Sequence, residues 1–249
     1  MAQWHEATVV NRIDWNDHLF SLRFKCDDFP SIKAGQFVKV GLSQSDGTVL
    51  SRPYSLVNGP KDGSLEIIAV PVEEGSLSPK LHNVQVNQTV QVMSPATGYL
   101  ILDEVPSAET LVLLATGTGV GPFLSILQTP QAWQNYTNII LVYAVRYSHD
   151  LAYLDLISHW QDEHPSRFAF IPIVSRDPMH DGLKGRIPEL INNGSIESMG
   201  NFRFTPSNTQ VMLCGNPDMI KESVIALEEK DLKKHLRRSP GQISMERYW

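Results

Sequence analysis

The chain has 249 residues, of which 42% are hydrophobic and 19% charged, and its formal net charge is −6. A chain of this length and balance forms one large or two ordinary globular domains. The negative charge argues against a general nucleic-acid-binding protein, and no apolar run approaches the roughly 20 residues of a membrane-spanning helix. The first residues contain no basic segment followed by an apolar stretch, so the sequence predicts no secretion signal.

The cysteines and histidines argue against a metal centre. Cys26 and Cys214 are the only two cysteines, and they cannot supply the four thiolates of a typical iron–sulfur cluster. Because they lie far apart and form no C-x-x-C motif, we expect no disulfide framework and a cytoplasmic location. The eight histidines are scattered without close ligand spacing, so we expect no metal site.

The first half of the chain has the pattern of antiparallel strands. Apolar and polar residues alternate, as in half-buried strands, and turn sequences rich in Asn, Asp and Gly separate the alternating segments. These segments are 6–15, 18–26, 35–43, 51–58, 64–72 and 88–95. They predict an antiparallel barrel or sandwich, with one short helix that has Ser78 as its N-cap and Pro79 at its first position.

The pattern changes near residues 102–106. Continuous apolar runs, which indicate strands buried on both faces, alternate with segments of helical spacing. The strand-like runs are 109–119, 137–146, 167–176 and 209–217, and the helical segments are 121–128, 150–164, 186–194 and 218–236. We expect Asp150 to cap the second of these helices. The alternation predicts a parallel sheet covered by helices, and hence two domains, residues 1–103 and 104–249.

A glycine-rich turn leads from the first of these strands into a helix. Gly117, Gly119 and Gly121 let the backbone approach a ligand closely, and a helix N-terminus presents free amides to an anion. The third glycine comes one residue too early for the standard dinucleotide pattern G-x-G-x-x-G. By itself the turn fits a tight connection as well as a nucleotide site.

Arginines gather at the ends of the next strands. Arg146 ends one strand, Ser175 and Arg176 end another, and Arg186 begins the helix that follows. Ligands of open α/β sheets bind outside the carboxyl ends of the strands, and guanidinium groups bind phosphate monoesters through forked contacts. Any one of these arginines fits a solvated strand end. Together they predict a site for a 2′-phosphate, and therefore for NADP rather than NAD.

Two further stretches complete the predicted sites. The last strand ends in 214–217, which suits the floor beneath a nicotinamide, although Cys214 fits a small buried hydrophobic residue equally well. In the first half, Arg52 suits a phosphate, Tyr54 the face of a flat ring and Ser55 its edge. The glycine and serine of 73–81 predict a second anion site made of backbone amides. Two dinucleotides on two domains are the arrangement of a hydride-transfer flavoenzyme.

These motifs, taken in chain order, resemble bacterial ferredoxin–NADP⁺ reductases. The matching stretches are RPYSLVN, GSLSPKL, ATGTGVGPFLSIL, LVYAVRYSHDLAY, VSRD, GRIPEL, VMLCGNPDMI and KKHLRRSPGQISMERYW, which together cover essentially the whole chain. The resemblance implies a Greek-key antiparallel β-barrel that binds FAD and a Rossmann-like parallel α/β domain that binds NADP(H). It implies an oxidoreductase that moves electrons between NADPH and a one-electron carrier through FAD, by hydride transfer and then single-electron steps.

The resemblance also implies roles for residues. Arg52 would contact the FAD pyrophosphate, Tyr54 would pack along the isoalloxazine, and Ser55 would hydrogen-bond near its N5 atom. The residues expected to be catalytic are Ser55, Cys214 and Tyr248. The other residues expected at FAD are Pro53, Ile68, Ala69, Val70, Gly75, Ser76, Leu77, Ser78, Thr116, Thr118 and Trp249. Those expected at NADP are Gly117, Gly119, Val145, Arg146, Ser175, Arg176, Arg186, Cys214, Gly215, Asn216, Pro217 and Asp218.

The tail departs from the plant-type relatives, which end in a tyrosine that stacks on the flavin. Here the chain continues through Tyr248 to Trp249, and the resemblance places such a terminal tryptophan against the FAD adenine. A frayed end is the alternative. Because two aromatic rings are costly to leave exposed, we expect both to be docked.

The electron carrier must be a separate protein, since the chain lacks the cysteines for a cluster. A basic patch formed by Lys233, Lys234, Arg237 and Arg238 suits an acidic ferredoxin or flavodoxin, and a solvated helix end explains the patch equally well. We expect a monomer. The alternatives are a reductase of the same superfamily that serves an oxygenase, free flavin or quinone, and a flavin-binding electron-transfer subunit without NADP turnover.

Overall fold

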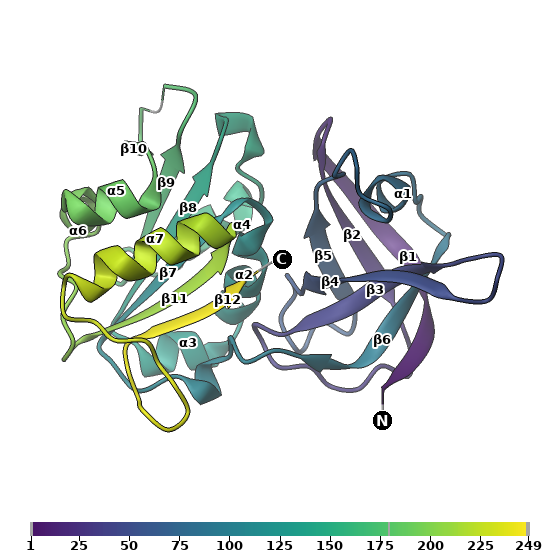
Figure 1. Cartoon of the computed structure of the whole chain (residues 1–249), viewed down its shortest axis with the longest axis horizontal. Helices are drawn as coiled ribbons and strands as arrows, with labels where there is room; N and C mark the ends of the chain where they lie inside the picture. The colour runs from purple at the N-terminus through teal and green to yellow at the C-terminus, as the bar shows by residue number, and fades with distance from the viewer. Residues whose placement is uncertain (1, 179, 248–249) are drawn as a thin grey trace. The chain divides into compact units, whose positions relative to one another are not determined.

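The computed structural model describes residues 2–178 and 180–247, and the chain forms two compact units (Figure 1). The first unit runs to Ile101 and also includes Gly121–Thr129, and the second comprises Leu102–Val120 and the residues from Pro130 onward. The predicted division after residue 103 therefore lies close to the first boundary, but the segment 121–129 packs with the first unit. In the described part of the chain, no helix has the length and apolarity needed to cross a membrane.

The first unit is a six-stranded antiparallel sheet. Its strands are β1 (Gln3–Asn16), β2 (Leu19–Lys25), β3 (Phe37–Ser43), β4 (Val49–Ser55), β5 (Leu65–Ala69) and β6 (Thr89–Thr97), in the order β4-β3-β6-β1-β2-β5. The two edges meet just beyond β4, where Leu56 bridges Ile67 and the Val57 amide donates to the Glu66 carbonyl at 2.9 Å. This pairing closes the sheet, and the predicted antiparallel class is confirmed.

Alternation along the strands builds the core of this unit. Phe20, Leu22 and Phe24 of β2 are fully buried and share a core with Val38 and Val40 of β3. Successive side chains of a strand point to opposite faces, so every second residue reaches the interior, and in β2 these residues are apolar. The predicted turn after β1 is closed by its asparagine: the Asn16 side-chain oxygen accepts hydrogen bonds from the amides of His18 at 3.0 Å and Leu19 at 2.9 Å.

The short helix α1 (Ser78–His82) begins differently from the prediction. Its N-cap is Leu77, with no side-chain cap, and Pro79 lies in the first turn. The Ser78 hydroxyl instead accepts a hydrogen bond from the Val72 amide at 2.9 Å. Ser78 is therefore not the N-cap, because its side chain closes the preceding turn rather than the helix end.

The second unit is a six-stranded parallel sheet with helices. Its strands, in the order β10-β9-β8-β7-β11-β12, are β7 (Thr110–Thr116), β8 (Asn138–Val145), β9 (Phe168–Val174), β10 (Leu183–Lys184), β11 (Thr209–Gly215) and β12 (Ile243–Arg247). The helices are α3 (Pro130–Asn135), α4 (Leu154–Glu163), α5 (Ile187–Asn192), α6 (Ser195–Gly200) and α7 (Pro217–Glu228). Short 3-10 turns η1 (Leu102–Glu104), η2 (Gly117–Val120) and η3 (Ser148–Asp150) connect them, and η2 leads into α2 (Gly121–Leu127).

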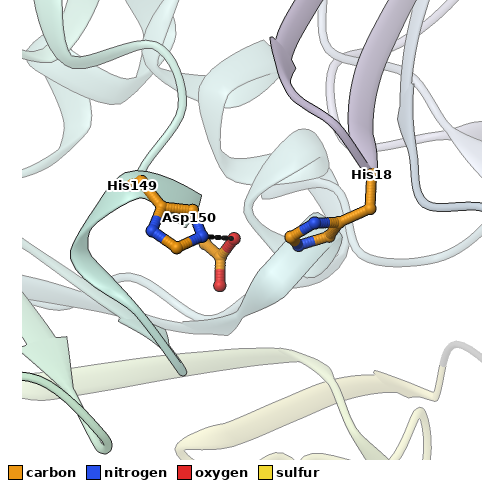
Figure 2. Close-up of side chains that lie close together, drawn as sticks. All are labelled: His18, His149 and Asp150. Carbon is orange, nitrogen blue, oxygen red and sulfur yellow. Dashed lines mark ion pairs between the residues drawn. The ribbon is translucent and has the colours of Figure 1, made fainter.

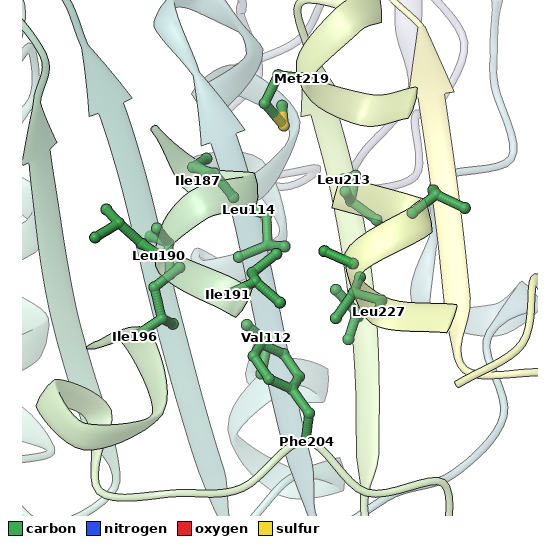
Figure 3. Packing of buried hydrophobic residues seen from close by; sticks show 14 of the residues in the cluster. Val112, Leu114, Ile187, Leu190, Ile191, Ile196, Phe204, Leu213, Met219 and Leu227 are labelled. Atoms are coloured by element: carbon green, nitrogen blue, oxygen red, sulfur yellow. The ribbon is translucent and has the colours of Figure 1, made fainter. Parts of the chain in front are cut away.

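Helices cover both faces of this sheet, as the continuous apolar strands predict. In Figure 1, α5 and α7 lie in front of it and α3 and α4 lie behind it. Figure 3 shows Ile187 and Ile191 of α5 and Leu227 of α7 packed against Val112 and Leu114 of β7. Both faces are therefore removed from water, which is why polar residues do not alternate along these strands.

The structure corrects three predicted details of this unit. Asp150 does not cap a helix that begins beside it, because α4 starts at Leu154 after Tyr153, which has a left-handed backbone. The helix predicted for 218–236 ends at Glu228, and Asp231 turns the chain with a φ of 67°. The tail, in which no strand was predicted, contributes β12, parallel to β11.

Candidate functional site

The strand order of the second unit identifies where a ligand would bind. β7 comes first in the chain, the next strands lie on one side of it, and β11 and β12 lie on the other. The direction of winding therefore reverses between β7 and β11. In open parallel sheets, the carboxyl ends of the strands on either side of such a reversal flank the ligand crevice.

Two predicted motifs meet at this reversal. The Asn216 amide donates to the Thr116 hydroxyl at 2.8 Å, which joins the end of β11 to the end of β7. A side-chain Cβ on Gly119 would lie 2.6 Å from the Cys214 carbonyl oxygen, and one on Gly215 would lie 2.1 Å from the Thr116 hydroxyl. Glycine is therefore required at both positions, and segments about a hundred residues apart form one turn surface.

The start of α7 extends this surface. Asn216 is its N-cap, and the side-chain oxygen accepts hydrogen bonds from the amides of Asp218 at 2.8 Å and Met219 at 3.2 Å. Pro217 occupies the first turn, where the missing N–H costs no hydrogen bond. The predicted stretch 214–218 is thus a strand end, a cap and a helix start at the carboxyl edge of the sheet.

Cys214 lies beside a carboxylate that sequence reasoning missed. Glu246 of β12 is its register partner. Burial, and then the neighbouring Glu246 carboxylate, raises the pKa of the fully buried Cys214 thiol. Burial also raises the pKa of Glu246 to about 7. Cys214 therefore favours its protonated thiol form and lacks the thiolate character of a nucleophile. Apolar Ile243 and Met245 alternate with polar residues, and this alternation was the sequence signal that could have predicted β12.

The predicted arginines do come together. β8 and β9 pair in register up to Val145 and Val174, and the Arg176 amide donates to the Arg146 carbonyl at 2.9 Å just beyond them. β10 ends beside Val174, and Arg186 follows it as the N-cap of α5. The three guanidinium-bearing residues are exposed at the carboxyl ends of three adjacent strands.

These arginines are available to an anion. Among residues 2–178 and 180–247, none of the three takes part in an ion pair. The nearby carboxylates have other contacts: Asp177 accepts hydrogen bonds from the Ser148 amide and hydroxyl at 3.1 and 3.3 Å. Figure 2 shows Asp150 with His149, whose Nε2 lies 3.6 Å from the carboxylate. The donor set suits a phosphate monoester. Ser175, also exposed, donates its hydroxyl to the Val145 carbonyl at 3.3 Å.

The first unit holds a second cationic group. Arg52 of β4 is exposed, and its Nη2 donates to the hydroxyl of exposed Ser76 at 3.3 Å. Tyr54 lies two residues after Arg52 on the same face of β4, and it is buried. Burial raises the pKa of Tyr54 to about 12, although the Arg52 charge opposes this rise. Arg52, Ser76 and neutral Tyr54 thus come together from the separate stretches that the sequence singled out.

The turn before α1 is tight enough to require glycine. The Gly75 amide donates to the Val72 carbonyl at 2.7 Å, and a Cβ on Gly75 would lie 2.9 Å from that oxygen and 3.1 Å from the Ser78 hydroxyl. The turn exposes Ser76 and buries Leu77. A guanidinium, an exposed hydroxyl and a side-chain-free backbone fit a diphosphate, so the residues fit the pyrophosphate of a dinucleotide.

The other predicted site residues differ in exposure. Ser55, Ile68, Ala69 and Thr118 are buried. Val70 is half-buried and Pro53 is exposed. Gly117 has a left-handed φ of 54°. Tyr248 and Trp249 lie outside the described residues, so their predicted contacts stay predictions.

The basic patch is not a helix end. Lys233, Lys234, Arg237 and Arg238 lie in the loop between α7 and β12. Lys234 pairs with Glu228 at 3.2 Å and Arg237 approaches Glu104 at 4.0 Å. The loop leads into the amino end of β12, which is parallel to β11 (Figure 1). It therefore lies at the amino ends of the parallel strands, whereas the arginines lie at the carboxyl ends.

Comparison with known proteins assigns a different family model to each half of the chain. Residues 6–99 match the family model described as an oxidoreductase FAD-binding domain, and residues 113–224 match the one described as an oxidoreductase NAD-binding domain. The flavodoxin/ferredoxin–NADP reductase of Escherichia coli (strain K12) is 42% identical, over 100% of both chains. The ferredoxin–NADP reductase of Pseudomonas aeruginosa is 32% identical, over 99% of this chain and 98% of the relative.

A solved structure supports the match in three dimensions. The ferredoxin NADP⁺ reductase of Neisseria gonorrhoeae, solved with bound FAD and NADP, is 32% identical over 100% of both chains, with a TM-score of 0.94. The predicted fold class and family are therefore confirmed. Identity over the full length and the pairing of the two domain types show that the chain belongs to the bacterial flavodoxin/ferredoxin–NADP reductase family.

Proposed function

We propose that this protein transfers electrons between NADPH and a one-electron carrier, with FAD bound by the first unit and NADP(H) by the second. The observation that carries the proposal is that each unit has its own exposed cationic group, Arg52 with Ser76 in one and three arginines in the other. The relatives that match over their full length carry the name flavodoxin/ferredoxin–NADP reductase or ferredoxin–NADP reductase.

FAD, when bound, supplies the chemistry that couples two-electron exchange with NADPH to one-electron exchange with the carrier. The protein binds FAD and orients it. Arg52 and the 75–78 turn hold the pyrophosphate of FAD, buried Tyr54 packs against its ring, and Ser55 offers a hydroxyl at the ring edge. Tyr54 does so in its neutral form, because burial raises its pKa to about 12.

The second unit selects and places the nicotinamide nucleotide. Arg146, Arg176 and Arg186 hold the 2′-phosphate, which NADH lacks, and thereby favour NADP(H). The turn surface built from Gly119, Gly215 and their neighbours lies where the winding reverses between β7 and β11. It supports the nicotinamide end of NADP(H). Cys214 lines that surface as a buried, protonated thiol, which excludes water without forming a covalent bond to substrate.

The electron carrier is a ferredoxin or flavodoxin, as the names of the relatives suggest. The basic loop 233–238 contributes by long-range attraction of an acidic partner. Because this loop lies at the amino ends of the parallel strands and the arginines lie at the carboxyl ends, we assign the loop to steering the approach of the carrier rather than to direct contact with the cofactors. The proposal includes a monomeric, cytoplasmic enzyme.

Anaerobic mixing of NADPH with the flavin-loaded protein tests the proposal. We expect the flavin absorbance to bleach, and we expect NADH to act much more slowly at equal concentration because it lacks the 2′-phosphate. A yellow protein that keeps its absorbance with NADPH would instead be a flavin-binding subunit without nucleotide turnover.

The choice of carrier needs a second assay. Cytochrome c reduction should depend on added ferredoxin or flavodoxin, with NADPH as electron source. Full activity without either carrier, or rapid reduction of free flavin or quinone, would favour the oxygenase-type or flavin-reducing branches of the same superfamily.

A further inference from the structure

Tyr147 follows Arg146 at the end of β8, and nothing in the proposed function uses it. Its hydroxyl oxygen accepts a hydrogen bond from Nη1 of Arg176 at 3.3 Å. The Arg176 guanidinium also lies over the Tyr147 ring, with Cζ 5.7 Å from the ring centroid. Arg176 thus contacts this tyrosine through an N–H donor and through the face of the ring.

Tyr147 is itself fixed by its neighbours. Its ring stacks on that of His149, with centroids 5.5 Å apart and planes 4° from parallel. Its amide donates to the Asp150 carboxylate at 3.3 Å, and the Asp150 amide donates back to the Tyr147 carbonyl at 3.0 Å. The turn 147–150 is therefore closed by hydrogen bonds at both ends, and it presents the ring to Arg176 in one orientation.

The backbone that carries Arg176 is held as well. Its amide donates to the Arg146 carbonyl at 2.9 Å, and Asp177 next to it accepts two hydrogen bonds from Ser148. What remains variable is the long Arg176 side chain, and ordering such a side chain when a ligand binds lowers affinity. A contact that orders the guanidinium beforehand reduces this loss. Guanidinium carries five N–H donors, so the bond to Tyr147 leaves most of them for a phosphate.

We propose that Tyr147 is a positioning residue that orients Arg176 toward the 2′-phosphate and so strengthens the preference of this site for NADPH over NADH. This inference rests on the proposed function, because it requires Arg176 at the 2′-phosphate. It adds a residue that acts only through another side chain, and its effect must therefore vanish when that side chain or the 2′-phosphate is removed.

The test is a double-mutant cycle with Tyr147→Ala, Arg176→Ala and the double variant, each with bound FAD. We expect Tyr147→Ala to raise the KM for NADPH and the Kd for 2′-phospho-AMP about 3- to 10-fold, and to leave the KM for NADH and the Kd for AMP unchanged. Tyr147→Phe, which keeps the ring and removes only the hydrogen-bond acceptor, should give a smaller increase and also guards against a folding failure. In the Arg176→Ala background, Tyr147→Ala should cause no further rise in the KM for NADPH or the Kd for 2′-phospho-AMP.

Three results would overturn the inference. The first is an unchanged ratio of the KM for NADPH to the KM for NADH in both Tyr147 variants. The second is an equal rise of the KM for the two nucleotides. The third is an undiminished effect of Tyr147→Ala on the KM for NADPH in the Arg176→Ala background. If Arg176→Ala lowers the NADPH preference while the Tyr147 variants do not, only this inference fails. If Arg176→Ala leaves that preference unchanged, the proposed 2′-phosphate site fails with it.

Discussion

At the scale of single residues, the pair of Cys214 and Glu246 shows how the fold sets protonation. Glu246 lies on an edge strand beside a fully buried thiol, and burial raises its pKa from an ordinary value of 4.5 to about 7. The folded protein therefore binds this proton more tightly than the unfolded chain does. The stability that Glu246 contributes is full below about pH 4.5 and is lost as the pH rises through 7.

Replacing Glu246 by Gln should remove this pH dependence. We expect Glu246→Gln and the wild type to unfold at similar temperatures at pH 5, and the variant to unfold at a higher temperature at pH 8, where the wild type carries a half-buried charge. Thermal unfolding of the FAD-loaded proteins between pH 5 and 8 measures this. Glu222→Gln, an exposed position on α7, is the matched control. The same difference between Glu246→Gln and the wild type at every pH would contradict the assignment.

At the scale of elements, the joint between β7 and β11 depends on the absence of side chains. Gly215 has a φ of 134°, and a Cβ there would meet the Thr116 hydroxyl at 2.1 Å and the Thr116 carbonyl oxygen at 2.8 Å. A Cβ on Gly119 would meet the Cys214 carbonyl oxygen at 2.6 Å. Because the Thr116 carbonyl oxygen and the Cys214 carbonyl group belong to the main chain at strand ends, the joint has little room to adjust.

Gly215→Ala should therefore lower the free energy of unfolding more than a glycine replacement made elsewhere at positive φ. We expect a loss of about 2–4 kcal/mol, from backbone strain together with overpacking. Gly47→Ala is the matched control, because Gly47 has a φ of 82° with no atom within 4 Å of the added Cβ. It should cost about 1 kcal/mol from conformation alone. Urea unfolding measures both, and equal losses would show that the contact with Thr116 is unimportant.

At the scale of the whole molecule, charge is distributed unevenly. The chain carries a net charge of −6, yet the loop between α7 and β12 contains four lysines and arginines within residues 233–238. Two of them are close to carboxylates, Lys234 to Glu228 and Arg237 to Glu104. Lys233 and Arg238 extend the positive field of the loop, and such a field changes association rates more than the stability of the bound complex.

Neutralising the loop should slow the encounter with an acidic carrier. For Lys233→Gln, Arg237→Gln and Arg238→Gln combined, we expect kcat/KM for ferredoxin or flavodoxin to fall about 3- to 10-fold at low ionic strength. The variant should converge with the wild type toward 1 M salt, where the Debye length is about 3 Å. Flavin reduction by NADPH should not change, and Lys221→Gln on α7 serves as the control. A loss that persists in high salt would indicate direct contact instead of steering.

The sequence by itself determined the features that depend on local periodicity and local chemistry. Alternation of period two gave the antiparallel unit, continuous apolar runs gave the parallel sheet, and arginines at predicted strand ends gave a cluster at the carboxyl ends of β8, β9 and β10, whose role as an anion site stays a prediction. These hold because side-chain direction follows from backbone geometry within a few residues. The motifs carried the family assignment for the same reason, since each is a contiguous stretch.

Only the tertiary structure decided which distant residues meet. β12 became a strand because β11 offered an open edge to pair with, and this pairing placed Glu246 beside Cys214. Tyr147 reached Arg176 because β8 and β9 end in register, and Ser76 reached Arg52 across 24 residues. The end of α7 at Glu228, where the helical pattern continued, was likewise set by the chain turning toward β12. Such contacts depend on strand register and packing between segments far apart in the chain, which no local pattern encodes.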